Sequence, residues 1–159
     1  MLVPRAWRRR SGGFSLLEIV IVMLLTAILT AVAVPQWAGA LQSFRASSAA
    51  SRIAADLTLA RTSAYSSSTS KTVTFSVGSS EYTVAGVTPL NRASGSYDVS
   101  LADDPYSCRL VSVWGQIGVQ TITFDGYGKP DKGGTIVVAA GNAQKVIVVS
   151  AVSGAAVVQ

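Results

Sequence analysis

A single carboxylate, Glu18, lies inside a long apolar stretch near the start of this 159-residue chain. The stretch covers residues 14–34, and Glu18 is its one charged side chain. An acid deep in lipid costs roughly 2.5–3.5 kcal/mol on insertion scales, so such residues are rare and usually have a partner. Glu18 is therefore a candidate functional residue, and its chemistry would be the pairing of a buried negative charge with a cation.

The composition excludes several classes of catalytic and metal site. The chain has no histidine, which excludes Ser-His-Asp triads, Cys-His dyads and histidine-based zinc sites. Its single cysteine, Cys108, excludes an intramolecular disulfide and a cysteine cluster. We expect Cys108 to be a small buried hydrophobe, with an intermolecular cross-link as the alternative. No cofactor, no metal and no enzymatic activity are expected.

Positive charge is concentrated in front of the apolar stretch. Of 13 Lys and Arg residues, four precede residue 14, namely Arg5, Arg8, Arg9 and Arg10. The 21 residues of the stretch would form a helix about 32 Å long, close to the roughly 30 Å hydrocarbon core of a bilayer. Arginines hold their end of such a span in the cytoplasm, so the following chain is expected on the outer side.

Two conventional interpretations of the N-terminus stay open. A cleaved secretory signal would use the Ala-Val-Ala of residues 31–33 as its cleavage site, although its apolar region is typically about 7–15 residues long. A plain membrane anchor is the second interpretation, and it leaves Glu18 without a role.

The segment around Glu18 resembles the processing site of type IV prepilins and type II secretion pseudopilins. It runs Arg10-Ser11-Gly12-Gly13-Phe14-Ser15-Leu16-Leu17-Glu18. The resemblance implies that a membrane peptidase cuts after Gly13 and methylates the new amino group of Phe14. Glu18 is then the fifth residue of the mature chain, a position that the family fills with Glu. It would pair with the Phe14 ammonium of a neighbouring subunit.

The same resemblance assigns roles to residues on both sides of the span. Arg8, Arg9 and Arg10 belong to a cytoplasmic leader that sets the topology. Pro35 lies where many pilins have a helix-kinking proline.

The helical pattern continues beyond Pro35. Apolar side chains recur at spacings near three and four: Trp37, Leu41, Phe44, Ile53, Leu57, Ala60 and Ala64. Arg52 and Asp56 form an i,i+4 pair that we assign to the opposite, polar face. One helix is therefore expected from about residue 14 to about residue 65, bent at Pro35. The Ala/Ser-rich residues 46–51 are expected to be helical rather than a linker.

After a polar loop at residues 66–70, the period becomes that of strands. Strands are expected at residues 72–77, 82–87, 97–101, 109–114, 121–124, 135–139, 146–150 and 155–158. The fold class is α+β and pilin-like, with a long N-terminal helix packed on a small antiparallel β-sheet head. The expected division is a leader (1–13), a transmembrane or filament-core helix (14–34), an amphipathic helix half (35–65) and a periplasmic β-rich head (71–159).

Most of the chain is similar to the GspH/FimT family of minor pseudopilins and minor type IV pilins. The similarity rests on Ala60-Arg61 in the helix, the segment from Ile122 to Gly128, and two closing aliphatic strands with Gly154. It implies a minor pseudopilin of a type II secretion system in a bacterial inner membrane, single-pass, with its N-terminus cytoplasmic and its C-terminal domain periplasmic. The implied partners are other pseudopilins or pilins, the prepilin peptidase, membrane lipid and a secretion or pilus assembly platform. A FimT-like minor pilin in pilus priming or DNA uptake, and a plain anchored binding domain, are the alternatives.

Charge bears on the DNA alternative. Candidate contacts are Lys129, Lys132, Lys145, Arg92 and Arg109, but no Lys or Arg follows Gly154. Removal of residues 1–13 takes away four basic and no acidic residues, so 9 basic face 8 acidic residues and the net charge falls from +5 to +1. The nearly neutral remainder gives no electrostatic reason to expect DNA, and a solvated strand face is the preferred interpretation of these cations.

Two acidic turns and one arginine complete the candidates. Asp125 and Asp131 are expected to be turn residues rather than calcium ligands, and so is the pair Asp103-Asp104. Arg61 is expected to anchor the helix to the head or to extend its stem across it.

Overall fold

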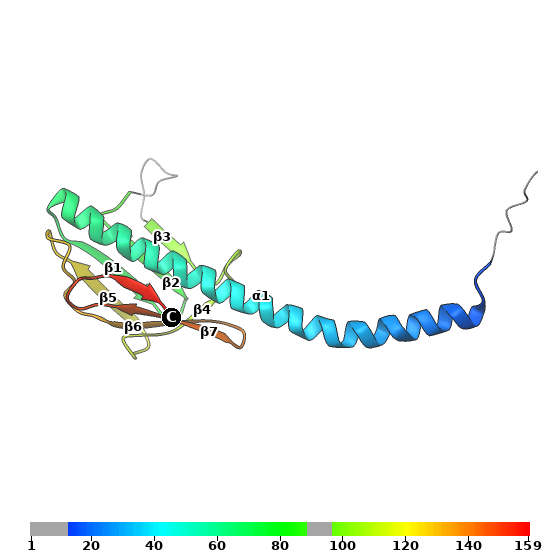
Figure 1. Ribbon diagram of the computed structural model, residues 1–159. Helices are drawn as coiled ribbons and strands as arrows, with labels where there is room; N and C mark the ends of the chain where they lie inside the picture. Colours follow the sequence, from blue (N-terminus) through cyan, green and yellow to red (C-terminus); the bar gives the residue numbers. More distant parts are fainter. Residues whose placement is uncertain (1–12, 89–96) are drawn as a thin grey trace, which may run out of the picture. The chain divides into compact units, whose positions relative to one another are not determined.

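The computed structural model describes residues 13–88 and 97–159 (Figure 1). The described chain forms one helix, α1 (Leu16–Ser67), followed by a series of strands. The strands are β1 (Lys71–Ser76), β2 (Glu81–Ala85), β3 (Tyr97–Ser100), β4 (Arg109–Val113), β5 (Val119–Phe124), β6 (Gly134–Ala140), β7 (Ala143–Val149) and β8 (Ala156–Val158). The α+β, pilin-like fold expected from the sequence is confirmed.

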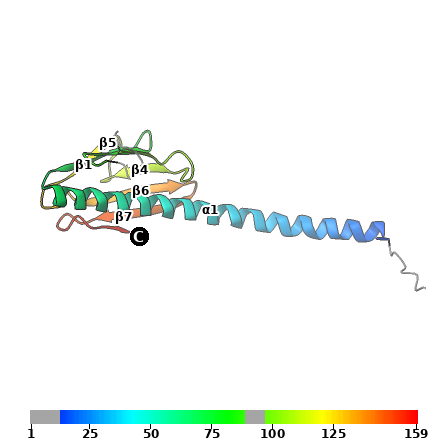
Figure 2. The ribbon, with the colours of Figure 1, turned by 90° about the horizontal axis from the view of Figure 1, so that it is seen from above.

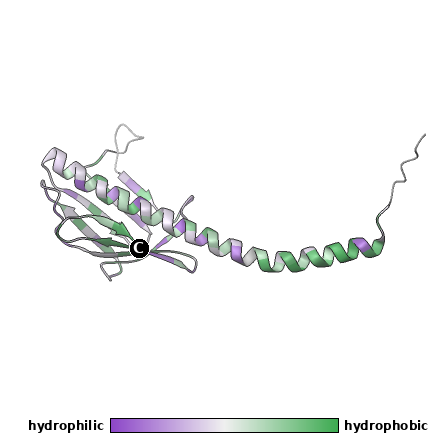
Figure 3. Ribbon diagram, viewed as in Figure 1, coloured by the Kyte–Doolittle hydropathy of each residue, from purple (hydrophilic) through white to green (hydrophobic). Residues whose placement is uncertain are grey.

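The chain divides into two compact units, residues 1–37 and 38–159, and α1 contributes to both. In the first unit the helix is almost uniformly hydrophobic (Figure 3). Its large apolar side chains from Phe14 to Val32 are between 47% and 80% exposed. By length and composition, α1 is the one helix in the described part of the chain that could cross a membrane.

The second unit contains two four-stranded sheets in place of one continuous sheet. Their strand orders are β3-β2-β1-β5 and β4-β6-β7-β8, and the neighbouring strands are antiparallel. Along the chain, β3 belongs to the first sheet, β4 pairs with β6 in the second sheet, and β5 pairs with β1 in the first sheet again. Figure 2 shows the helix of this unit lying along the strands.

The head-facing side of α1 is lined by small residues, and these allow the helix to approach the sheets closely. Its buried apolar positions are Ala46, Ala49, Ala50, Ile53, Leu57, Ala60 and Ala64, each at most 1% exposed. They pack in one core with strand residues such as Phe75, Ile122 and Ile136. The expected helix at residues 46–51 is therefore confirmed.

One part of the expected apolar stripe is wrong. Trp37 and Phe44 are 78% and 70% exposed, and Leu41 is also exposed, so the packed stripe begins at Ala46. Gln42 instead contacts the β6–β7 turn, where its Oε1 accepts a hydrogen bond from the Asn142 backbone amide at 3.2 Å. The helix ends as expected in the serine-rich segment, where Ser68 adopts a positive φ of 50°.

Candidate functional site

The predicted processing residues lie at the start of the described chain. Arg8, Arg9 and Arg10 lie outside the described residues. Gly13 precedes the helix, and a Cβ built on it would meet no atom within 4 Å. An accessible glycine backbone before the apolar helix is what a peptidase needs at a cleavage site. Pro35 lies in helical backbone, but its side chain is outside the described residues, so the bend stays a prediction.

Glu18 lies on one side of α1 together with apolar side chains. It belongs to the first turn of the helix. A shallow hollow of about 320 Å³ is lined by Phe14, Glu18, Ile19, Val22 and Met23, at spacings that share a helix face. No hydrogen bond or ion pair to Glu18 occurs within the described ranges 13–88 and 97–159. The face can accept an apolar partner that carries one cation.

A second acidic residue, Asp56, is buried in the head beneath two tyrosines. Asp56 is 4% exposed. Its Oδ2 accepts hydrogen bonds from Tyr82 Oη at 2.5 Å and from Arg52 Nε at 3.0 Å, and its Oδ1 accepts one from Tyr97 Oη at 2.8 Å. Arg52 Nη2 also donates to Tyr97 Oη at 2.7 Å. The expectation of an Arg52–Asp56 pair on the polar face is therefore wrong for Asp56, which points into the core.

The environment of this cluster favours neutral tyrosines. Burial, and then the negative charge of Asp56, raise the pKa of Tyr82 far above its usual range. Burial and the hydrogen bond to Asp56 raise the pKa of Tyr97. Tyr82 belongs to β2 and Tyr97 to β3, so the cluster connects α1 to two strands of the first sheet. Its role is therefore structural.

The position of Asp56 relative to the apolar residues of the helix indicates its burial. Asp56 lies three residues after Ile53 and four before Ala60, which places it on the buried stripe rather than opposite it. The tyrosine partners could not be identified in this way, because they lie 26 and 41 residues further along the chain.

Residues of the GspH/FimT-like pattern meet at the C-terminal end of α1. A Cβ built on Gly128 would lie 3.4 Å from Arg61 Cγ, and one on Gly154 would lie 3.0 Å from Phe124 Cε1 and 3.4 Å from Arg61 Cδ. Both glycines have positive φ angles, 74° and 68°. The stem of Arg61 thus packs against two glycine turns, which confirms its expected role as an anchor.

Comparison with known families identifies the family to which the chain belongs. Residues 49–154 match the family described as type II transport protein GspH, and residues 8–34 match the prokaryotic N-terminal methylation motif. The first match covers more than half of the chain and contains the whole cluster around Arg61.

The chain belongs to the GspH family. No curated protein and no solved structure matches it significantly. Membership supports a structural, pilin-like subunit of type II secretion, and in general an interaction with other pseudopilins and with a prepilin peptidase. The N-terminal apolar helix of this GspH chain fits a single-pass inner-membrane anchor.

The basic residues considered for DNA do not share one element of the GspH head. Lys129 and Lys132 lie between β5 and β6, Arg109 begins β4, and Lys145 lies in β7. Arg92 falls outside the described residues.

The aspartates in the turns of the head accept hydrogen bonds from nearby backbone amides or hydroxyl groups. Asp131 Oδ1 accepts a hydrogen bond from the Thr123 amide at 2.9 Å, and Asp104 Oδ1 accepts one from Ser107 Oγ at 3.0 Å. No group of three or more His, Cys, Asp or Glu residues in the described part of the chain could hold a metal ion. Cys108 is 3% exposed, as expected for a buried hydrophobe, and burial raises the pKa of its thiol.

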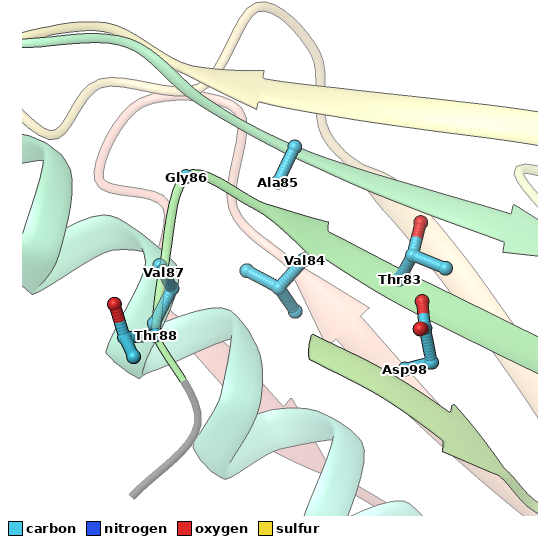
Figure 4. A pocket seen from close by; sticks show the side chains of 7 residues that line it. All are labelled: Thr83, Val84, Ala85, Gly86, Val87, Thr88 and Asp98. Carbon is cyan, nitrogen blue, oxygen red and sulfur yellow. The ribbon is translucent and has the colours of Figure 1, made fainter. Parts of the chain in front are cut away.

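A hollow of about 500 Å³ lies beside the end of β2 (Figure 4). Its lining includes Thr83, Val84, Gly86, Thr88 and Asp98. Residues 89–96, which connect this lining to β3, lie outside the described residues, so we assign no function to the hollow.

Proposed function

We propose that this GspH chain is a minor pseudopilin that enters a short filament after its leader is removed. Cleavage after Gly13 makes Phe14 the new N-terminus, which is then N-methylated. The proposal rests above all on the methylation motif at residues 8–34 joined to a GspH domain at residues 49–154. It treats residues 1–13 as the leader, 14–34 as the membrane and filament-core helix, 35–65 as the amphipathic half and 71–159 as the periplasmic head.

Within this proposal, assembly depends on one buried ion pair. Residues around Glu18 are apolar, so a carboxylate without a partner is costly in lipid or in a filament core. The Phe14 ammonium of a neighbouring subunit supplies a cation, and methylation keeps its charge. Because apolar helices can pack in several registers, a single buried polar pair selects one of them.

Processing can be tested by intact mass of the full chain produced with and without a prepilin peptidase. We expect a methylated N-terminus at Phe14 only when the peptidase is present. Gly13→Leu is expected to block cleavage, because it adds a branched side chain at the scissile residue, while Gly12→Ala serves as the neighbouring control. An N-terminus that is the same with and without peptidase contradicts the proposal.

Assembly is tested separately from processing. With Glu18→Gln, we expect normal cleavage but at least about a tenfold loss of cross-linking to neighbouring subunits, since about 1.4 kcal/mol of lost pairing already gives that factor. Glu18→Asp keeps the charge and is expected to retain more cross-linking. Equal cross-linking in all three proteins contradicts a role for the ion pair.

A further inference from the structure

The loop after β5 is rigidly built and presents a tyrosine to solvent. Asp125 Oδ1 accepts hydrogen bonds from the Tyr127 and Lys129 amides at 2.9 and 2.8 Å. The Asp125 amide donates to the Lys129 carbonyl at 2.9 Å, and the Gly128 amide donates to the Asp125 carbonyl at 2.8 Å. Four hydrogen bonds thus hold a five-residue segment, yet Tyr127 at its centre is 86% exposed.

Two glycines place this loop directly on the end of α1. A Cβ on Gly126 would lie 2.9 Å from the backbone carbonyl of Ser68, and Gly128 has a positive φ. A larger residue at either position would move the loop away from the helix. The Tyr127 ring is therefore held outward by a fixed backbone, although burial of that ring contributes almost nothing to the fold. A preorganised aromatic side chain loses little entropy on binding a partner.

The neighbours of Tyr127 complete a surface of the type found at protein–protein contacts. Tyr65, on α1, is 68% exposed, and its Cβ would lie 3.6 Å from a Cβ at Gly128. The stem of Arg61 is fixed by Gly128 and Gly154, and Lys129 is exposed. Within the described ranges, neither Arg61 nor Lys129 has an ion-pair partner. Tyrosine and arginine are the residue types that dominate binding energy at interfaces.

We propose that the surface formed by Arg61, Tyr65, Tyr127 and Lys129, here called the Tyr127 surface, binds a carboxylate-bearing segment of another protein chain. A guanidinium whose stem is fixed is well suited to pair with a carboxylate in a bidentate geometry. The two tyrosines supply apolar contact area beside it. The inference concerns the head alone and does not depend on processing at Gly13.

The charges around the loop favour a protein partner over a nucleic acid. Asp125 and Asp131 are exposed, and they lie four and two residues from Lys129 in the sequence. A polyphosphate chain bound at Lys129 would carry several negative charges past these two carboxylates, whereas a protein segment can present a single carboxylate to the cations.

The test places a photoreactive benzoylphenylalanine at position 127 of the full chain in its own membranes. Mass spectrometry then identifies the linked peptide. We expect one predominant protein adduct whose linked peptide carries Asp or Glu beside the cross-linked residue. Arg61→Glu and Lys129→Glu are each expected to reduce its yield at least about tenfold, a loss of about 1.4 kcal/mol or more. Arg109→Glu makes the same charge change at the start of β4 and is expected to leave the yield unchanged. Arg109 pairs with Ala139, close to the β6–β7 turn that contacts Gln42.

Exchanging the two charges distinguishes a specific ion pair between Lys129 and the partner from nonspecific binding. Changing the acidic residue of the linked peptide to Lys is expected to restore the adduct with Lys129→Glu. Lys129 is exposed, so this variant is expected to fold even where Arg61→Glu does not. The proposal is overturned if the probe links only to lipid or nucleic acid, or if neither Arg61→Glu nor Lys129→Glu changes the yield of the protein adduct. It is also overturned if the same probe at position 117, where Ile117 is 80% exposed on another turn, gives an equal adduct.

Discussion

Asp56 links α1 to two strands of the first sheet by hydrogen bonds. It is the acceptor for Tyr82, Tyr97 and Arg52. Asp56→Ala leaves two buried hydroxyl groups without their acceptor, so we expect a loss of about 2–4 kcal/mol in the free energy of unfolding. Tyr82→Phe removes one hydrogen bond and should cost about 1–1.5 kcal/mol. Urea denaturation of the full chain in detergent micelles measures both, and equal stability of Asp56→Ala and the parent would contradict this role.

The same cluster predicts how stability changes with pH. The folded state raises the pKa of Tyr82 and Tyr97, whereas an unfolded tyrosine ionises near pH 10. Their contribution is therefore fully present below about pH 10 and is lost as the pH rises above it, by up to roughly 1.4 kcal/mol per pH unit for Tyr82. We expect the urea midpoint to fall steeply between about pH 10 and 12. Tyr82→Phe should show a shallower fall, and an identical slope would contradict the assignment.

At the scale of elements, local pattern predicted the helix and the strands well. The spacing of apolar residues predicted the buried face of α1, which includes Ile53, Leu57, Ala60 and Ala64. The alternation of apolar and polar residues predicted strands that differ from the observed ones mainly at their ends. The expected strand at 146–150, for example, is β7 at Ala143–Val149, because the turn at Gly141 lets Ala143 pair with Ala140. The pattern could not show that Phe44 is exposed, since that depends on where the head ends.

Two glycines, one in the loop before β6 and one in α1, should respond oppositely to substitution by alanine. A Cβ on Gly133 would clash with the Ala151 backbone and lie 2.7 Å from the Val149 carbonyl oxygen, whereas one on Gly39 in α1 would meet nothing within 4 Å. Gly133→Ala is therefore expected to cost about 1–3 kcal/mol. Gly39→Ala should raise the free energy of unfolding by up to about 0.5–1 kcal/mol through its helix propensity. Urea midpoints of the two variants compare them, and a tolerated Gly133→Ala would argue against this packing of β7 against the loop before β6.

For the whole molecule, charge is unevenly distributed along the chain. Four of 13 basic residues lie within residues 1–13, and the remainder has a formal charge of +1. Because salt-dependent DNA binding scales with the number of phosphates neutralised, we expect the chain lacking residues 1–13 to give no mobility shift with duplex DNA at about 0.15 M salt. A shift that weakens with salt and is lost with Lys129→Ala would support the FimT-like alternative.

The division of the head into two sheets could not be predicted from sequence. Each strand was visible in the local pattern, but the pairing of β4 with β6 rather than with β5 depends on contacts across the whole domain. The N-terminal motif was easier to predict from sequence, because Gly13, Phe14 and Glu18 lie within six consecutive residues. The partners of Asp56 and the display of Tyr127 required three-dimensional structure.

The position of β4 in the sequence, between two strands of the other sheet, has a consequence for folding of the head during synthesis. Synthesis proceeds from the N-terminus, so β4 exists before its pairing strand β6, which ends at Ala140. A chain interrupted between these strands keeps an unpaired strand edge, the kind of edge that invites aggregation. Since β4 lies between β3 and β5 in the sequence but pairs in the second sheet, we expect truncation before β6 to disturb both sheets. The head is therefore expected to be retained or degraded as one piece, and partial chains should be cleared rather than accumulate.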